Sequence, residues 1–227
     1  MKRFEDYLED ILKLDIEREQ RAGKPEAIFG EGKSVEVIVR IAEKYKSIGK
    51  PVLFTRLSKE QMDALRSMGA EVNEIARTAT FGRAEKIIGR VAIVTAGTAD
   101  IGVAEEARVT AEFLGLEVIK FYDVGVAGLH RIVEPVRAIR EKDVDSVIVI
   151  AGMEGALPSV LAGLLDLPII AVPTSVGYGV HLKGISTLFA MLQSCPSGVA
   201  VVNIDNGFGA AVFAYLISRV KTKSNIR

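Results

Sequence analysis

Apolar positions follow two different patterns along the chain, and the change falls at about residue 85. Before that point they recur at helical spacing among many charged residues, as in the segment 4–12. A second helix is predicted over residues 34–48 with Ser34 as its N-cap, and Ser58 begins a third with the spacing of a capping box. Short apolar runs, PVLFT and AEVNEI, flank this third helix. Residues 1–85 are therefore predicted to form a small N-terminal α+β region.

After this point the chain alternates between apolar runs and helical segments. The runs RVAIVTAG, LEVIKFYD, DSVIVIAG, LPIIAVPT and GVAVVNID are rich in β-branched residues, as is typical of parallel strands buried on both faces. Helices are predicted at 103–114, 129–141, 157–165, 182–192 and 208–220, and Pro135 is expected to kink or divide the second. This alternation predicts an α/β fold for residues 86–227, a three-layer αβα domain around a doubly wound parallel sheet.

Each predicted strand is followed by a glycine-rich loop. In doubly wound folds ligands bind at the carboxyl ends of the strands, so these loops form the expected binding edge. Glycines let backbone amides approach a phosphate closely, and each following helix adds a positive N-terminal end. The loops, which indicate a nucleotide-like anionic ligand, are residues 96–102, 123–131, 151–159, 173–179 and 203–209.

The sequence excludes several kinds of nucleotide and metal chemistry. Gly97 and Gly102 have the spacing of a Walker A loop, but Val103 and Ala104 stand where lysine and a hydroxyl residue are needed. No G-x-G-x-x-G opens the first helix, which disfavours a standard dinucleotide-binding dehydrogenase. Two histidines and one cysteine cannot build a structural zinc site. Mg²⁺ held by carboxylates and substrate phosphates fits, and no tightly bound organic cofactor is expected.

Composition narrows the class of protein further. The chain has 227 residues, 49% of them hydrophobic, with 29 basic and 29 acidic side chains. This balance gives no electrostatic support for a nucleic-acid partner, and no apolar run approaches the roughly 20 residues of a membrane span. The start, MKRFEDYLED, lacks the apolar segment of a signal peptide, and a single cysteine suits a reducing compartment. We expect a cytoplasmic globular protein.

Three side chains are candidates for catalysis. His130 follows the second predicted strand and could serve as a general acid or base, or as a structural histidine. Glu154 lies in a glycine loop and could accept a proton or simply be solvated. Cys195 precedes a proline, so the helix before it should end there; the thiol is either a nucleophile or an inert core residue. We expect all three on the ligand-binding edge.

Four polar residues of the first and last loops are candidates for ligand binding. Thr98 and Asp100 could bind phosphate, ribose or a metal ion, although Asp100 could equally be a helix N-cap. Asp205 and Asn206 could bind ribose, metal or water, although Asp-Asn-Gly also suits an ordinary turn.

Several motifs together resemble the LarB family. They are AGTADIGVAEEA, DVGVAGLHRI, AGMEGALPSVLAGL, VPTSVGYG and SCPSGVAVVNIDNGFGAA, with PEAIFGEGKSVE near the N-terminus. The C-terminal domain is similar in turn to PurE, the phosphoribosylaminoimidazole (AIR) carboxylase of purine synthesis. The resemblance implies an αβα fold that assembles into homo-octamers. The segment YGVHLKG departs from it, with His181 and Lys183 where small or apolar residues are expected.

The resemblance also implies a reaction. LarB-like proteins begin the synthesis of the nickel-pincer nucleotide by carboxylating the pyridinium ring of nicotinic acid adenine dinucleotide at carbon 5, with CO₂ or bicarbonate. Hydrolysis of the phosphoanhydride then releases AMP and leaves pyridinium-3,5-biscarboxylic acid mononucleotide. The resemblance assigns the nucleophile to Cys195, and Glu154 and then His130 become the candidate bases. The expected substrate contacts are Thr98, Asp100, Ser175, Tyr178, Asn203, Asp205 and Asn206.

Two other functions stay open at this point. A PurE-like aminoimidazole ribonucleotide carboxylase or mutase would need the phosphate-binding loops and a histidine but no cysteine nucleophile. A non-catalytic nucleotide-binding protein would bind a dinucleotide without turnover.

Overall fold

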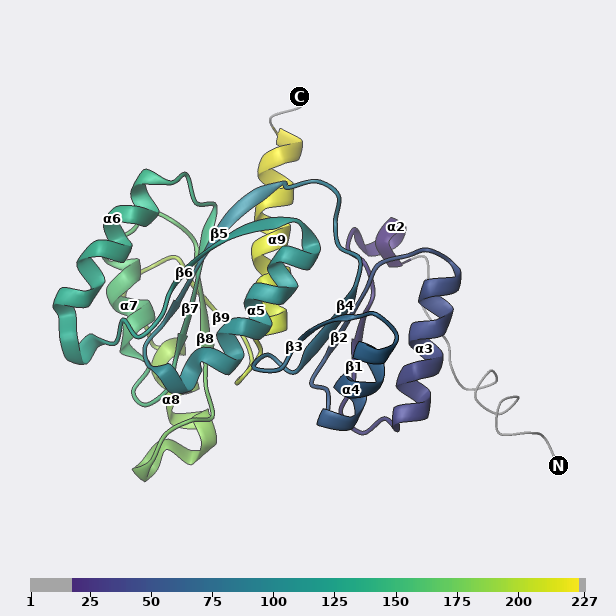
Figure 1. The fold of residues 1–227 in the computed structure, drawn as a ribbon. Helices are drawn as coiled ribbons and strands as arrows, with labels where there is room; N and C mark the ends of the chain where they lie inside the picture. Colours follow the sequence, from purple (N-terminus) through teal and green to yellow (C-terminus); the bar gives the residue numbers. More distant parts are fainter. Residues whose placement is uncertain (1–17, 225–227) are drawn as a thin grey trace. The chain divides into compact units, whose positions relative to one another are not determined.

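The computed structural model describes residues 18–224, which divide into one unit ending at Arg83 and a second beginning at Ala84 (Figure 1). The helix predicted over residues 4–12 lies outside the described residues. The first unit contains a four-stranded sheet in the order β1-β2-β4-β3, in which β1 runs parallel to β2 and the other pairs are antiparallel. Its elements are α2 (Arg18–Ala22), β1 (Ala27–Phe29), α3 (Val35–Ser47), β2 (Val52–Thr55), α4 (Lys59–Ser67), β3 (Glu71–Asn73) and β4 (Thr78–Phe81).

Side-chain caps fix the starts of both longer helices of this unit. The Ser34 hydroxyl accepts the amide of Val37 at 3.4 Å, which confirms the predicted start of α3. Ser58 and Gln61 form the predicted capping box, each side chain accepting the other's backbone amide. The Gln61 amide group also donates to the carbonyls of Gly30 and Lys33, so one buried side chain ties α4 to the loop before α3.

The second unit is built on a five-stranded, wholly parallel sheet in the order β6-β5-β7-β8-β9. Three 3-10 helices, η1 (Thr98–Asp100), η2 (Val126–Ile132) and η3 (Gly179–Gly184), follow β5, β6 and β8. The other elements are β5 (Gly89–Thr95), α5 (Ile101–Leu114), β6 (Leu116–Phe121), α6 (Val133–Glu141), β7 (Ser146–Ala151), α7 (Ala156–Ala162), β8 (Ile169–Pro173), α8 (Ile185–Leu192), β9 (Val199–Val201) and α9 (Gly207–Ser224).

Helices cover both faces of this sheet, so the predicted three-layer αβα fold is confirmed (Figure 1). On one face α5 and α9 meet through small residues, among them Ala107 and Ala211, which lets the two helices approach closely. On the other face α6, α7 and α8 bury Ile139, Leu161 and Met191 against the strands. Every residue of β7 and β8 is buried, as a central parallel strand requires.

The segment before Pro135 differs from the prediction. The helix predicted over 129–141, which Pro135 was expected to kink or divide, is divided: the chain forms the 3-10 helix η2 and then begins α6 at Val133. Pro135 therefore lies in the first turn of α6, where a backbone amide has no helical partner to lose. Its ring is buried beneath the helix start, so the proline helps to set where α6 begins rather than bending it.

Candidate active site

The carboxyl edge of the parallel sheet is organised around Asp100. This side chain is only 4% exposed, and its two oxygens bind different loops. One accepts the amide of Gly97 at 2.9 Å, and the other accepts the hydroxyl of Thr174 at 2.8 Å. Thr174 directly follows β8, so Asp100 joins the loop after β5 to the loop after β8. Asp100 is among the site residues predicted from the sequence, whereas Thr174 is not, although its position at a strand end was the available signal.

The surroundings of Asp100 favour the neutral form of its carboxyl group. Burial raises the pKa of its carboxyl, and the nearby Asp205 carboxylate raises that pKa further, while the Gly97 and Thr174 hydrogen bonds partly offset the effect. Two neighbouring carboxyl groups at one edge attract a cation. A metal ion bound with the ligand would fit there, and so would a positively charged ring of the ligand itself.

Asp205 joins the loop after β9 to the loop after β8. It follows β9 with a left-handed backbone (φ 54°), and its amide donates to the carbonyl of Pro173 at 2.8 Å. Its side chain accepts the amide of Ser175 at 2.7 Å. Asn206 accepts the amide of Gly209 at 2.8 Å, which caps the start of α9. Asp205 and Asn206 thus form the turn that the sequence offered as an alternative to ligand binding, and the loops after β8 and β9 are held together.

Glu154 extends from a sharply turned loop after β7. Its neighbours Met153 and Gly155 both have left-handed backbones, with φ of 51° and 65°. The Met153 carbonyl accepts the hydroxyl of Thr187 on α8, and a Cβ on Gly155 would lie 2.9 Å from the Thr187 methyl group. The loop is therefore fixed on both sides of Glu154. The carboxylate itself is exposed and makes no hydrogen bond or ion pair within the described part of the chain, so it is available to a ligand.

The remaining candidates on this edge are exposed. His130 lies on η2, next to Arg131, whose guanidinium pairs with Asp123 at 3.3 Å. Tyr178 is 81% exposed at the tip of the loop after β8. By topology these side chains belong to the same edge as Glu154, together with Thr98, Ser175 and Asn203, which are also exposed.

The segment YGVHLKG, in which the sequence departs from the family resemblance, is shaped by a buried histidine. His181 is 5% exposed, and its Nδ1 accepts the amide of Gly184 at 3.2 Å. A Cβ on Gly177 would lie 2.6 Å from the His181 ring, so only glycine fits there. Leu182 and Lys183 have left-handed backbones, which delays the start of α8 to Ile185, three residues beyond the prediction. His181 thus sets the course of the loop that carries Ser175 and Tyr178.

Cys195 is exposed to solvent. It stands between α8 and β9, on the segment that enters the strand, and the expected common edge with Glu154 and His130 stays a prediction. A Cβ on Gly155, beside Glu154, would lie 3.1 Å from the Met191 side chain, so the end of α8 packs against the loop that carries Glu154. The predicted end of the preceding helix is confirmed, since α8 ends at Leu192. Ser194, next to the cysteine, shares a hydrogen bond of 2.7 Å with Ser159 on α7.

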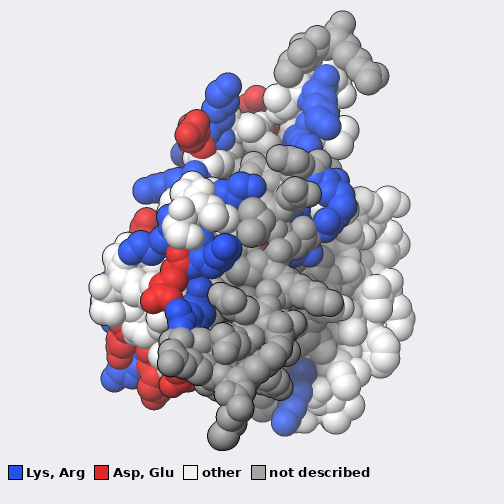
Figure 2. Space-filling model, turned by 90° about the vertical axis from the view of Figure 1, so that its right-hand side faces the viewer, with Lys and Arg blue, Asp and Glu red and all other residues white. Residues whose placement is uncertain are grey.

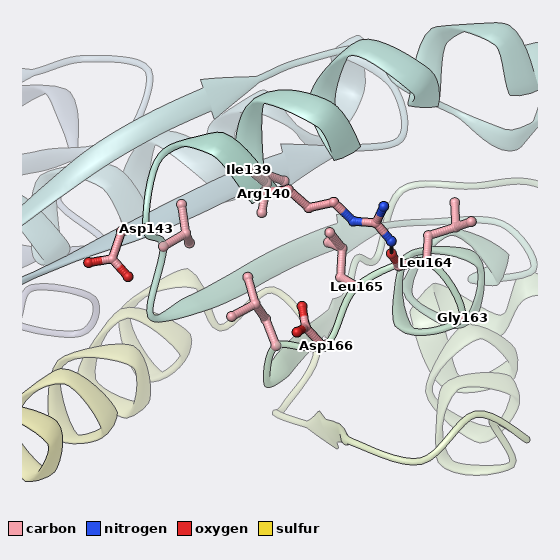
Figure 3. Close-up of a pocket in the computed structure, with 9 residues that line it drawn as sticks. Ile139, Arg140, Asp143, Gly163, Leu164, Leu165 and Asp166 are labelled. Atoms are coloured by element: carbon pink, nitrogen blue, oxygen red, sulfur yellow. Dashed lines mark hydrogen bonds between the residues drawn. The ribbon is translucent and has the colours of Figure 1, made fainter.

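A large hollow also lies at the amino edge, away from the glycine-rich loops (Figure 3). It has a volume of about 650 Å³ and is formed by the end of α6 and the connections that precede β7 and β8. Figure 3 shows Arg140 extending across it to the Leu164 carbonyl, to which its guanidinium donates at 2.6 Å. Asp143 and Asp166 lie at its border. None of the sequence-predicted site residues lines it.

Acidic and basic side chains are interspersed along the left-hand edge of the face in Figure 2, in keeping with their equal numbers. Such alternation is unlike the basic stripe of a nucleic-acid interface. Across residues 18–224, no three His, Cys, Asp or Glu side chains converge as a metal cluster. Within the same range, every helix is too short or too polar to span a bilayer.

Known proteins share both units. Residues 90–226 match the family described as AIR carboxylase, and residues 4–83 match the LarB/PurE-like N-terminal domain. An uncharacterized protein of Methanocaldococcus jannaschii is 44% identical over 97% of this chain and 89% of its own. The N5-carboxyaminoimidazole ribonucleotide mutase of the same organism is 34% identical over 59% of this chain and 82% of its own. The crystal structure of a PurE2 variant from Treponema denticola has a TM-score of 0.46 and 21% identity, covering 60% of this chain and 91% of that one.

The second unit is thus an AIR carboxylase-like αβα domain, of a family of carboxylases and mutases. With the N-terminal match added, the chain belongs to the LarB family over nearly its whole length.

Proposed function

We propose that this protein converts nicotinic acid adenine dinucleotide, CO₂ and water to pyridinium-3,5-biscarboxylic acid mononucleotide and AMP, the first step of nickel-pincer nucleotide synthesis. The observation that carries the proposal is the exposed thiol of Cys195, the sole cysteine, in a chain that joins a LarB/PurE-like N-terminal domain to an AIR carboxylase domain. A mutase acting on aminoimidazole ribonucleotides needs neither this thiol nor the additional domain.

A thiol solves the chemical problem of the first reaction. A pyridinium ring is electron-poor and does not attack CO₂. Addition of the Cys195 thiolate at ring carbon 4 neutralises the ring and makes carbon 5 an enamine nucleophile, which forms the new bond to CO₂. A base then removes the carbon 5 proton, the C–S electron pair returns to sulfur, and the aromatic ring is restored. Glu154, exposed in a fixed loop, is the first candidate base, and His130 is the second.

The second reaction needs charge stabilisation at the phosphates. Water adds to one phosphorus atom of the anhydride, and AMP leaves with the bridging oxygen. Mg²⁺ fits the acidic carboxyl edge, where Asp205, assisted by Asp100, would hold it with the substrate phosphates, because Mg²⁺ needs only one or two protein carboxylates. The ion would neutralise charge that develops on the phosphates. Thr98, Ser175, Tyr178, Asn203 and Asn206 are the proposed substrate contacts around it.

Self-association is part of the proposal. The loop after β8 and helix α8 expose a series of large apolar side chains, which is unusual for a surface that stays in water. A neighbouring copy would cover them, and Cys195, which follows α8, would lie beside that interface. We propose self-association on this basis; the resemblance to the LarB family implies that the assembly is a homo-octamer, and we expect it in the cytoplasm. The apolar side chains are Val176, Tyr178, Val180, Leu182, Ile185, Phe189 and Leu192.

Mass spectrometry of reaction mixtures tests the function. Wild-type protein and Cys195→Ala would each be incubated with nicotinic acid adenine dinucleotide, bicarbonate and Mg²⁺. We expect the carboxylated mononucleotide and AMP from the wild type and neither from the variant. Unchanged dinucleotide from folded wild-type protein would refute the assignment.

The likeness to N5-carboxyaminoimidazole ribonucleotide mutases supports a second candidate function. Conversion of that mutase substrate by wild type and by Cys195→Ala alike would favour a PurE-like mutase. Dinucleotide binding without any product from either substrate would indicate a non-catalytic nucleotide-binding protein.

A further inference from the structure

The connection that carries Cys195 has few contacts of its own. The residues from Cys195 to Gly198 link the end of α8 to β9, and no side chain of residues 195–197 makes a hydrogen bond to any described residue. Cys195 and Ser197 are both exposed. Pro196 fixes only its own backbone angle and supplies no amide. A nucleophile on such a connection would sample many positions unless something nearby held it.

The serine pair, Ser159 and Ser194, supplies that restraint. Their hydroxyl oxygens lie 2.7 Å apart and share a partly buried hydrogen bond across 35 positions of sequence. Ser194 immediately precedes the cysteine, and its amide also donates to the Met191 carbonyl at 3.2 Å. The backbone is therefore fixed one residue before Cys195 and stiffened one residue after it.

The other end of the hydrogen bond is on a well-anchored helix. Leu157 and Leu161 of α7 are 1% and 0% exposed in the core, so Ser159 between them has a defined position. A second hydroxyl bond, from Thr187 to the Met153 carbonyl, joins α8 to the loop before α7. Helix α8 is thus bonded to the α7 segment near both of its ends. Movement of the Cys195 backbone would require the hydrogen bond between Ser159 and Ser194 to break.

We propose that Ser159 and Ser194 are positioning residues that hold the Cys195 thiol for attack on the substrate ring. The inference rests on the proposed function, since it assumes that Cys195 is the nucleophile. Neither serine touches the reacting atoms; both act through the backbone of Cys195. A misplaced nucleophile loses rate although the substrate still binds, so the effect belongs to turnover rather than to KM.

Four variants test the pair: Ser159→Ala, Ser194→Ala, the double variant, and Ser159→Thr, which retains a hydroxyl. Ser197→Ala is the matched control, because Ser197 lies on the same connection and its hydroxyl has no partner in the described structure. We expect each alanine variant to lower kcat about three- to tenfold at unchanged KM, with the double variant no worse than either single one. Ser159→Thr should recover most of the loss, and Ser197→Ala should match the wild type.

Amide hydrogen exchange supplies a readout that needs no substrate. Exchange in the segment 193–199 should become about three- to tenfold faster in both serine-to-alanine variants and stay unchanged in Ser197→Ala. Unchanged exchange overturns the inference, and so does faster exchange with unchanged kcat, or additive losses in the double variant. If Cys195→Ala retains full turnover, the proposed nucleophile is wrong. If wild type has no turnover at all, the proposed function is wrong and the exchange data alone decide whether the pair holds this segment.

Discussion

The hydroxyl of Thr174 donates to Asp100 at 2.8 Å, although 74 positions of sequence separate the two residues. Both side chains are buried at an edge of the sheet where most neighbouring side chains are exposed. The bond connects the loops after β5 and β8, which lie on either side of β7 in the sheet. The carboxyl edge is therefore held in shape by the chain itself before any ligand binds.

Removal of this hydroxyl should destabilise the protein measurably. Thr174→Val keeps the shape of the side chain but leaves a buried Asp100 oxygen without its donor, which costs about 1–3 kcal/mol. Urea unfolding followed by circular dichroism would measure the change. Thr98→Val is the control, since Thr98 is exposed and its hydroxyl has no hydrogen bond in the described residues. Equal stability of the two variants would contradict the role given to Thr174.

Asp145, at the amino edge of the sheet, should make the unfolding free energy depend on pH in acid. Burial alone would raise the pKa of Asp145, but hydrogen bonds from Lys221, Ser218 and the Arg90 amide lower it below its ordinary value. A carboxyl whose pKa is lowered by folding adds stability above its unfolded pKa of about 3.9 and loses that contribution as the pH falls through the folded pKa.

Asp145→Asn should therefore cost about 1–2 kcal/mol at pH 7 and progressively less as the pH falls below about 4. Denaturant unfolding at a series of pH values would show this convergence with the wild type. Asp143→Asn is the matched control, because the Asp143 carboxylate is exposed and lies 3.4 Å from the same lysine. A constant difference between Asp145→Asn and wild type across the pH range would rule out the ionised carboxylate as the cause.

Most of the fold can be predicted from the sequence, because its strands and helix caps depend on residues that are close together along the chain. Every residue of β7 is buried, and the apolar run DSVIVIAG predicts that without reference to any distant residue. The same holds for the caps at Ser34 and Ser58, whose partners are three residues away. The bond between Asp100 and Thr174 depends instead on which strands become neighbours, which no single segment specifies.

The position of Cys195 illustrates the same limit at the site. A glycine-containing segment beside a strand looks alike whether the chain is leaving the strand or entering it. The segment SCPSG precedes β9, whereas the other candidate loops follow their strands. Only the order of helix and strand along the chain distinguishes the two cases, and a motif considered alone does not show it.

Glu154 should be needed for turnover and not for folding. Its carboxylate is exposed and has no partner among the described residues, so Glu154→Gln should leave the unfolding free energy within about 0.5 kcal/mol of wild type. Loss of a general base should lower kcat about 10²- to 10⁴-fold. Glu141→Gln, at an exposed carboxylate on α6, is the control. Wild-type kcat in the Glu154→Gln variant would mean that Glu154 is not the base, and His130 would become the candidate.

Mixed assemblies should regain activity that neither parent variant has. Cys195 follows α8, whose exposed apolar side chains we propose as an interface between copies, so we expect a working site to combine the thiol of one copy with the carboxylate of another. Cys195→Ala and Glu154→Gln would be co-expressed with different affinity tags, and doubly tagged assemblies would be purified. Random pairing places an intact thiol beside an intact carboxylate in about one quarter of the sites of a closed assembly. Product formation near that fraction of the wild-type rate is the expected result. Activity no higher than that of the two parent variants would mean that each site takes both groups from one chain.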